Sequence, residues 1–379
     1  MARLGDVCTI VSGTTPKSSC PEYWDGNINW VTPAELNDES DVIYESQRKI
    51  TKQAVIDSSL KPFPAGTVLL SSRAPIGKVA IAGTEMYCNQ GFKNLICTDA
   101  IYNRYLYHFL KGKTEYLNSL GRGATFKEIS KSIVEEIEIP LPPLEEQRRI
   151  AALLDEVGDL IAKRQAQLDK LDLLVKSRFV EMFENGKKVK EVLLGDISEF
   201  VTVGIANSAT YAYAKSGVVM LRNQNIKENY LDDSDLIFIK KEFADKYKTK
   251  SLKKNDILVI RTGYPGVACL VPAQYEGAQT FTTLIVRLKD SLETDPNFIC
   301  HYINSLHGKA YVEGAKVGVA QQNFGAKALA LMPIMLPQIE LQNDFSNFCV
   351  QIDKLKFSVH HGLDKLELLK KALMQQYFR

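Results

Sequence analysis

The seven residues LDKLDLL at 168–174 recur, with one conservative change, as LDKLELL at 363–369. At this offset of 195 positions the match extends upstream without a gap, so that IPLPPLEEQRRIAALL (139–154) lies over IMLPQIELQNDFSNFC (334–349). Two unrelated helices rich in leucine, lysine and aspartate could share such a composition by chance. The gapless length and the matching proline-containing starts favour an internal duplication instead.

The duplication continues more weakly on the N-terminal side of each copy. VLLSSRAPIG (68–77) resembles ILVIRTGYPG (257–266), and one gap places Arg73 near Arg261. The chain is therefore predicted to contain two copies of one unit. Each copy would consist of a mixed segment of about 140 residues followed by a helical segment of about 40.

The two helical segments carry a heptad pattern, in which apolar residues alternate steps of three and four as in a coiled-coil seam. The predicted seam consists of Leu154, Val157, Ile161, Leu168, Leu171, Val175, Ile352, Val359, Leu363, Leu366 and Leu373. A parallel pair would need both mixed segments at one end, so an antiparallel coiled coil with a pseudo-twofold repeat is favoured. Two ordinary core helices are the alternative, but helices of about 40 residues are unusually long for that.

The mixed segments consist of short strands and turns and lack the repeated βαβ pattern. The strand-like stretches are 66–72, 78–82, 256–261 and 282–288, and the helix-like stretches are 103–120 and 297–313. An α+β fold is therefore expected in both copies.

Composition sets broad limits on the class of protein. Apolar residues make up 45% and charged residues 24%, and no apolar run approaches the ~18 residues of a membrane span. The net charge of +2 neither requires nor excludes a nucleic-acid partner. The seven cysteines are scattered, without a C-x-x-C pair, which favours reduced thiols in the cytoplasm over disulfides or zinc ligation.

The common catalytic motifs are absent from the sequence. It has no phosphate-binding loop, no G-x-G-x-x-G after a strand and no H-E-x-x-H. The Asp/Asn-Pro-Pro-aromatic motif of adenine methylation is missing too, since the one Pro-Pro pair, Pro142-Pro143, opens a helix. The five histidines show no metal-ligand spacing. We therefore expect no catalytic residue, no metal site and no cofactor within this chain.

Local charge points more clearly to a partner than net charge does. Residues 239–261 hold eight Lys/Arg against three Asp/Glu, a run that suits phosphate contacts but equally suits a solvated face. RNQN (222–225) follows a predicted strand, and GVAQQNFGAK (318–327) repeats its polar side chains. Arg, Asn and Gln are the residues that bind guanine and adenine edges. An ordinary polar loop is the alternative for each of these stretches.

A family resemblance follows from these motifs. GATFKEIS (123–130) and IPLPPLEEQRRI (139–150), together with SSRAPIGKVAI (71–81) and the duplication, resemble the specificity subunit of type I restriction–modification systems. The resemblance covers nearly the whole chain. The second copy departs from the motif at Gln338, where the first has Pro143, which affects only the sharpness of that helix start.

The resemblance implies a division of the chain into two target recognition domains and two spacer helices. Each recognition domain would read one half of an interrupted DNA sequence. The expected boundaries are 1–140 for recognition domain 1, 141–185 for spacer helix 1, 186–335 for recognition domain 2 and 336–379 for spacer helix 2.

The resemblance also implies partners. Two modification subunits, which bind S-adenosylmethionine and methylate adenine, would dock on the helices. Restriction subunits would add ATP- and Mg²⁺-dependent translocation and cleavage of DNA. The chain itself would be a non-catalytic DNA-binding subunit.

For this role we select candidate DNA contacts from the polar and cationic stretches of each copy. They are Arg73, Lys78, Thr125, Lys127, Arg222, Asn223, Gln224, Asn225, Arg261, Gln321 and Gln322. Two other functions compete with DNA recognition: a protein scaffold that binds no DNA, and a fused methyltransferase or nuclease whose motif is not recognised.

Overall fold

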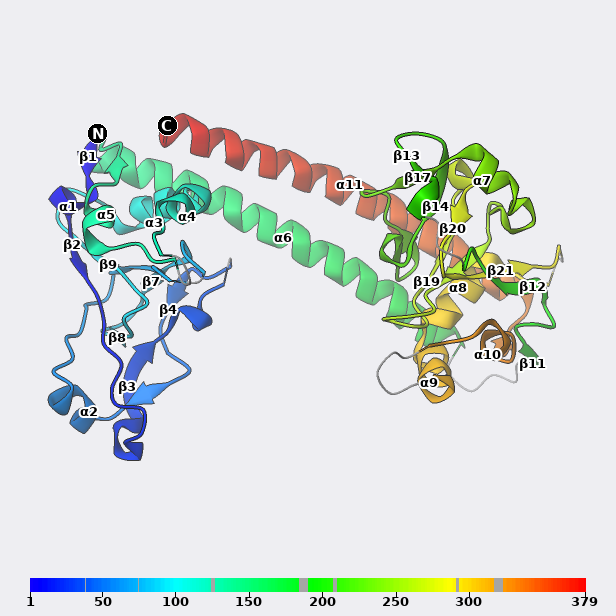
Figure 1. Cartoon of the computed structure of the whole chain (residues 1–379), viewed down its shortest axis with the longest axis horizontal. Helices are drawn as coiled ribbons and strands as arrows, with labels where there is room; N and C mark the ends of the chain where they lie inside the picture. The colour runs from blue at the N-terminus through cyan, green and yellow to red at the C-terminus, as the bar shows by residue number, and fades with distance from the viewer. Residues whose placement is uncertain are drawn as a thin grey trace. The chain divides into compact units, whose positions relative to one another are not determined.

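The computed structural model describes residues 1–37, 39–73, 75–123, 127–183, 190–206, 210–290, 293–316 and 323–379. These residues form two compact units, many of whose elements are labelled in Figure 1. Unit 1 comprises Met1–Ala166 together with His360–Arg379, and unit 2 comprises Gln167–Val359. Each unit has its own hydrophobic core.

Unit 1 is a mixed helix and sheet structure. Its strands are β1 (Ala2–Arg3), β2 (Cys8–Val11), β3 (Trp24–Val31), β4 (Val42–Ile43), β5 (Lys49–Ile50), β6 (Val68–Leu70), β7 (Val79–Ala82), β8 (Tyr87–Cys88), β9 (Asn94–Cys97) and β10 (Glu138–Ile139). Its short helices are α1 (Leu4–Val7), α2 (Lys52–Asp57), α3 (Asn103–Lys111), α4 (Thr114–Leu120) and α5 (Lys131–Glu135), with 3-10 turns η1 (Pro21–Tyr23) and η2 (Pro33–Glu35). The main sheet has the order β2-β9-β6-β7-β4, and a second sheet has the order β5-β3-β8.

Unit 2 repeats this plan. Its strands are β11 (Lys190–Leu193), β12 (Ser198–Val203), β13 (Tyr213–Ala214), β14 (Val218–Leu221), β15 (Ile226–Lys227), β16 (Tyr230–Leu231), β17 (Ile237–Ile239), β18 (Ile257–Val259), β19 (Ala268–Leu270), β20 (Gln279–Thr280), β21 (Leu284–Leu288) and β22 (Pro333–Leu336). Its short helices are α7 (Lys241–Asp245), α8 (Pro296–Asn304), α9 (Leu306–Ala315) and α10 (Ala326–Ala330), with η3 (Thr210–Ala212), η4 (Asn223–Asn225), η5 (Lys248–Lys250) and η6 (Ala273–Tyr275). Sheet orders are β12-β21-β18-β19 and β13-β17-β14-β20.

The central strands β6 and β18 are apolar at every position because both faces of each are covered. Val68 and Leu70 point into the core that the helices of unit 1 cover, whereas Leu69 points into a second core on the opposite face. Ile257 and Leu258 divide in the same way in unit 2. Side chains of a strand alternate between its two faces, so a continuous apolar run here marks burial on both sides.

Two long helices, α6 (Leu144–Phe183) and α11 (Ile339–Tyr377), contribute to both units. In unit 1 the Arg149 guanidinium donates to the Tyr377 hydroxyl at 3.5 Å. In unit 2 the rings of Phe179 and Phe345 lie 5.4 Å apart in an edge-to-face contact. In each unit an early residue of one helix thus meets a late residue of the other, so the pair is antiparallel. The eleven residues predicted for the seam are all buried or half-buried.

A buried glutamine fastens the start of each long helix. Gln147, which is fully buried, accepts a hydrogen bond from the Tyr102 backbone N–H at 2.8 Å and donates to the carbonyls of Ala100 and Pro142 at 3.0 and 2.8 Å. Gln342 repeats the arrangement. It accepts from the Asp295 N–H at 2.9 Å and donates to the carbonyls of Glu293 and Pro337 at 3.0 and 2.8 Å. Three backbone groups per copy are satisfied by one side chain, which explains why glutamine stands at both positions.

The helix-like stretches 103–120 and 297–313 differ from the sequence expectation, because each is two helices. In unit 2 the break falls at Ser305, whose backbone is extended and whose hydroxyl accepts from the Gly308 N–H to cap α9. In unit 1 it falls at Gly112 and Lys113, where α3 ends and the backbone of Lys113 leaves the helical region before α4 begins. Local backbone turns therefore interrupt the helical pattern within each stretch. Among the described residues, no helix is both long and apolar enough to cross a membrane.

Candidate nucleic-acid interface

A hairpin turn carries one candidate arginine in each unit. The β6–β7 turn is closed by the Ser71 N–H donating to the Lys78 carbonyl at 2.9 Å, and the β18–β19 turn by the Ile260 N–H donating to the Val267 carbonyl at 2.8 Å. These registers correct the sequence pairing of the two arginines by one residue. Thr262, and not Arg261, occupies the place of Arg73.

The two arginines nevertheless contact equivalent partners. The Arg73 Nε lies 2.9 Å from a Glu128 carboxylate oxygen. Arg261 donates from Nε to the Asn323 side-chain oxygen at 2.9 Å. Glu128 bridges to Arg73 and Asn323 bridges to Thr262 in the same antiparallel manner. The two arginines therefore stand one residue apart in the strand register, yet each contacts the residue at the equivalent position, Glu128 or Asn323.

Glu128 is ionised in this arrangement. Its partial burial alone would raise its pKa, but hydrogen bonds from Lys93 and Arg73 lower the pKa below the ordinary value. The Lys93 ammonium lies 3.1 Å from the other carboxylate oxygen, and the lysine side chain is only 9% exposed. The carboxylate is therefore shared between a buried cation and a half-exposed one.

The RNQN stretch forms a compact turn after β14, at η4. The Asn225 side chain is 2% exposed; its oxygen accepts from the Arg222 N–H at 2.9 Å, and its amide donates to the carbonyls of Asp232 and Asp235. The Asp235 carboxylate also accepts from Arg222 at 2.9 Å and from Gln224 at 2.6 Å. Asn225 thus shapes the loop, while Arg222 and Gln224 lie at its surface, held by Asp235.

An equivalent turn in unit 1 was not recognised in the sequence. Thr32 caps η2, and the Glu35 side chain accepts from the Thr32 N–H at 2.7 Å, as Asn225 does for Arg222. Glu35 also accepts from the Gln47 N–H at 2.6 Å, which ties in the following loop. The signal was present, because T-P-A-E matches the S/T-x-x-E capping box. The two copies share this device without sharing a residue identity, so alignment alone missed it.

The other candidate contacts are placed as follows. Lys78 is half-buried and donates to the Leu36 carbonyl at 2.5 Å, so it braces the loop beyond η2. Asn223 donates to the Thr262 carbonyl at 3.2 Å, linking η4 to the hairpin. Lys127 is exposed. Thr125, Gln321 and Gln322 lie outside the described residues.

The lysine-rich run 239–261 divides into one half-buried lysine with structural contacts and several exposed cations. Lys250 donates to the carbonyls of Val203 and Gly204 at 2.8 and 3.0 Å, a structural role. The exposed lysines of the run are Lys240, Lys241, Lys246, Lys248, Lys253 and Lys254. Short helical turns therefore present most of this charge to solvent.

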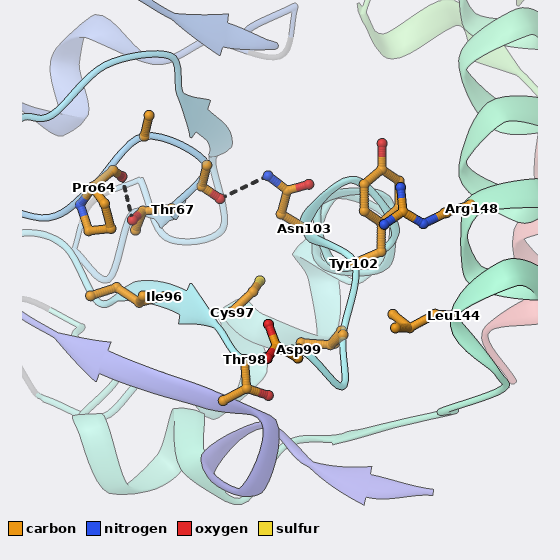
Figure 2. Close-up of a pocket in the computed structure, with 13 residues that line it drawn as sticks. Pro64, Thr67, Ile96, Cys97, Thr98, Asp99, Tyr102, Asn103, Leu144 and Arg148 are labelled. Carbon is orange, nitrogen blue, oxygen red and sulfur yellow. Dashed lines mark hydrogen bonds between the residues drawn. The ribbon is translucent and has the colours of Figure 1, made fainter.

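A pocket of about 400 Å³ lies in unit 1 between the sheet and the start of α6 (Figure 2). Two of its polar side chains, Asn103 and Thr67, donate to backbone carbonyls of the lining. Asn103 donates to the Gly66 carbonyl at 3.0 Å, and the Arg148 guanidinium lies over the Tyr102 ring at 4.9 Å. Its thirteen lining residues include none of the candidate DNA contacts. In the part of the chain that the structure describes, no group of three or more His, Cys, Asp and Glu side chains could hold a metal ion.

These features define a class of protein: a duplicated α+β scaffold, each copy presenting a held arginine and an exposed polar loop of the kind that suits an anionic partner. Comparison with known proteins gives the family. The type I restriction modification DNA specificity domain matches residues 1–171 and again 186–368. The chain therefore belongs to the type I restriction–modification specificity family.

Two curated relatives come from Methanocaldococcus jannaschii. The MjaIX type I restriction enzyme specificity subunit is 36% identical over 284 residues, which cover 69% of this chain and 65% of that protein. The MjaVIII specificity subunit is 25% identical over 393 residues, which cover 99% of this chain and 90% of that protein. The chain thus spans just under two thirds of the first relative and most of the second.

Solved structures share the fold. One from work on complex assembly and conformational transition of the type I restriction–modification system has a TM-score of 0.64 at 18% identity, over 100% of this chain and 97% of that one. The S subunit of the M. genitalium type I system has a TM-score of 0.57 at 14% identity, over 100% and 95%. Both confirm the architecture of two α+β domains with two long helices.

Proposed function

We propose that this chain recognises a bipartite, interrupted DNA sequence, with one half read by each unit. The observation that carries the proposal is the repeated hairpin arginine, held in both units by the residue at position 128 or 323. The polar loops beside the two arginines differ in sequence, as two different half-sites require. Arginine beside polar side chains suits both base edges and phosphates.

The chain acts without chemistry of its own and directs that of its partners. Two modification subunits supply S-adenosylmethionine-dependent methylation of adenine, and restriction subunits supply ATP- and Mg²⁺-dependent cleavage. The complex works in the cytoplasm. Family membership and the absence of common catalytic motifs from the sequence support this division of labour.

The long helices provide surfaces for the modification subunits. Leu173 and Leu174 of α6 are 62% and 46% exposed, and their duplicated counterparts Leu368 and Leu369 of α11 are 69% and 45% exposed. Adjacent exposed leucines at the same place in both copies suit a partner that binds each copy once. Two equivalent surfaces fit two modification subunits.

The decisive experiment is co-expression with the cognate modification subunits, followed by mapping of methylated adenines across the host genome. A bipartite motif is expected. Replacing residues 1–140 by those of another family member should change one half of that motif and leave the other intact. Methylation without a bipartite motif, or loss of both halves on the exchange, would contradict the proposal.

The enzyme rival is tested on the purified chain and the scaffold rival on the complex. Incubation with S-adenosylmethionine and DNA, or with Mg²⁺ and DNA, should give no turnover. Methyl transfer or cleavage by the chain alone would favour a fused enzyme. Failure of the complex to shift any genomic DNA fragment at low salt would favour a scaffold that binds only proteins.

A further inference from the structure

The residues that hold the two hairpin arginines occupy equivalent positions but differ in charge. In unit 1 the Ile129 N–H donates to the Ser72 carbonyl at 3.0 Å, and in unit 2 the Phe324 N–H donates to the Arg261 carbonyl at 3.0 Å. These bonds fix the preceding residues, Glu128 and Asn323, beside the hairpin in the same way. Glu128 and Asn323 are therefore at equivalent positions in the fold, but one side chain is a carboxylate and the other a neutral amide.

In unit 1 the position carries a full negative charge. Besides its contacts with Arg73 and Lys93, Glu128 has its backbone locked to Arg122 by two hydrogen bonds of 2.9 and 3.0 Å. The carboxylate is about one third exposed, so it faces whatever approaches Arg73. The Lys93 ammonium on the other carboxylate oxygen is buried, so the groups at the surface that an approaching phosphate would meet are the guanidinium and the carboxylate, and repulsion from the carboxylate would offset part of the attraction.

In unit 2 the position is neutral. The Asn323 oxygen orients Arg261 through one hydrogen bond and adds no charge of its own beside the guanidinium. Within the described ranges, no carboxylate lies within 4.0 Å of a nitrogen of Arg261. A phosphate approaching Arg261 therefore meets a single oriented cation with a neutral amide beside it.

The two arrangements suit different parts of DNA. The Arg73–Glu128 pair offers donors next to an acceptor, which matches the major-groove edge of a G·C pair: guanine O6 and N7 accept, and cytosine N4 donates. The oriented cation of unit 2 matches a phosphate, whose neutralisation releases counterions and makes binding depend on salt.

We propose that Glu128 and Asn323 are positioning residues that assign different tasks to the two arginines: Arg73 reads a base pair, and Arg261 anchors the phosphate backbone. This inference rests on the proposed DNA recognition. It adds that the two hairpin arginines contribute by different means: Arg73 adds sequence selectivity to one half-site, and Arg261 adds electrostatic affinity to the other.

The test is the salt dependence of DNA binding by the full chain assembled with its modification subunits, measured by fluorescence anisotropy on the mapped target duplex. Asn323→Asp should reduce the slope of log affinity against log salt concentration by about 0.9, the value for one phosphate contact, and Glu128→Gln should steepen it by a similar amount. A change of about 0.9 in the slope, over the fourfold rise from 50 to 200 mM salt, changes the affinity about threefold relative to wild type.

The arginine variants separate the two tasks. Arg261→Ala should flatten the slope by about 0.9 and weaken binding to all sequences alike, whereas Arg73→Ala should leave the slope nearly unchanged and relax one position of the methylated motif. Equal slopes in Arg73→Ala and Arg261→Ala would overturn the inference. So would Glu128→Gln or Asn323→Asp weakening binding at all salt concentrations without changing the slope, because that is the signature of a structural role.

Two controls keep the outcomes distinct. Thermal unfolding of each variant checks that the unit is folded, and if Glu128→Gln unfolds through loss of the Lys93 ion pair, the Asn323→Asp arm still decides. If the wild-type complex shows no preference for its own methylated motif, the proposed function fails. If it shows that preference and the slopes do not respond, only the positioning inference fails.

Discussion

Gln147 and Gln342 provide the sharpest test of how the long helices are fastened. Gln147→Glu keeps the size of the side chain and its bond from the Tyr102 N–H, but removes the amide that donates to the Ala100 and Pro142 carbonyls. Two buried acceptors then lack a donor and face a carboxylate. Each unsatisfied group costs about 1–3 kcal/mol, so the variant should lose at least about 2 kcal/mol of unfolding free energy.

The assay is differential scanning calorimetry of the full chain. In a domain of 150–250 residues, about 2 kcal/mol corresponds to a fall in Tm of about 4–8 °C. Gln342→Glu should cause a similar fall, and the losses should add in the double variant because the two glutamines share no partner. The matched control is Gln351→Glu on the exposed face of α11, which should change the Tm by about 1 °C or less. A Gln147→Glu protein that melts with the control would refute the role assigned to this side chain.

Three further variants test the packing, electrostatics and titration of unit 2. Phe179→Ala should lower the free energy of unfolding in urea by about 3–5 kcal/mol, because the buried ring contacts Phe183, Phe298 and Phe345. A loss below about 1 kcal/mol would mean that this aromatic cluster does not stabilise the unit. The Lys356–Asp172 ion pair, largely exposed on the aspartate side, should show a coupling of about 0.2–1 kcal/mol in a double-mutant cycle, and a larger value would contradict its solvent screening. Burial, helped by Lys356, lowers the pKa of His301 to about 4, so the unfolded state takes up the proton first as the pH falls. The unfolded state binds this proton below about pH 6.5 and the folded state only below about pH 4, so wild type loses stability as the pH falls between these values. His301→Phe should lose less stability over this window, by about 3 kcal/mol, measured by urea unfolding at each pH. Parallel pH profiles of His301→Phe and wild type would contradict the assignment of this pH dependence to His301.

The duplication was the part of the fold most fully encoded in local sequence. Heptad spacing and proline-containing starts act over a few residues, so the helices and the matching of Gln147 with Gln342 followed from an ungapped offset. Their antiparallel pairing was favoured separately, because a parallel pair would need both mixed segments at one end. The α+β class followed from apolar stretches such as 66–72, which the structure confirms as the strand β6.

The candidate site was less predictable because it depends on register and on partners remote in sequence. The gap that placed Arg73 near Arg261 in the sequence comparison does not exist in the structure, because the strand ladders give the two hairpins the same length and set the arginines one residue apart. Asn225 was selected for its base-reading chemistry, but its burial depends on a loop that closes ten residues later at Asp235. The recognition-domain boundaries and the individual DNA contacts stay predictions.

The C-terminal segment His360–Arg379, which completes unit 1, has a consequence for the order of folding. Phe378 is buried against Tyr105 and Phe109, with ring centroids 5.0 and 5.6 Å away, and Leu373 joins the same core. A ribosome makes these residues only after all of Gln167–Val359, which forms a unit by itself. Unit 1 therefore cannot complete its core until unit 2 has been synthesised, and until then Tyr105 and Phe109 lack their contact with Phe378. In nascent chains of this protein, the N-terminal unit should therefore depend on chaperones for longer than the later unit does.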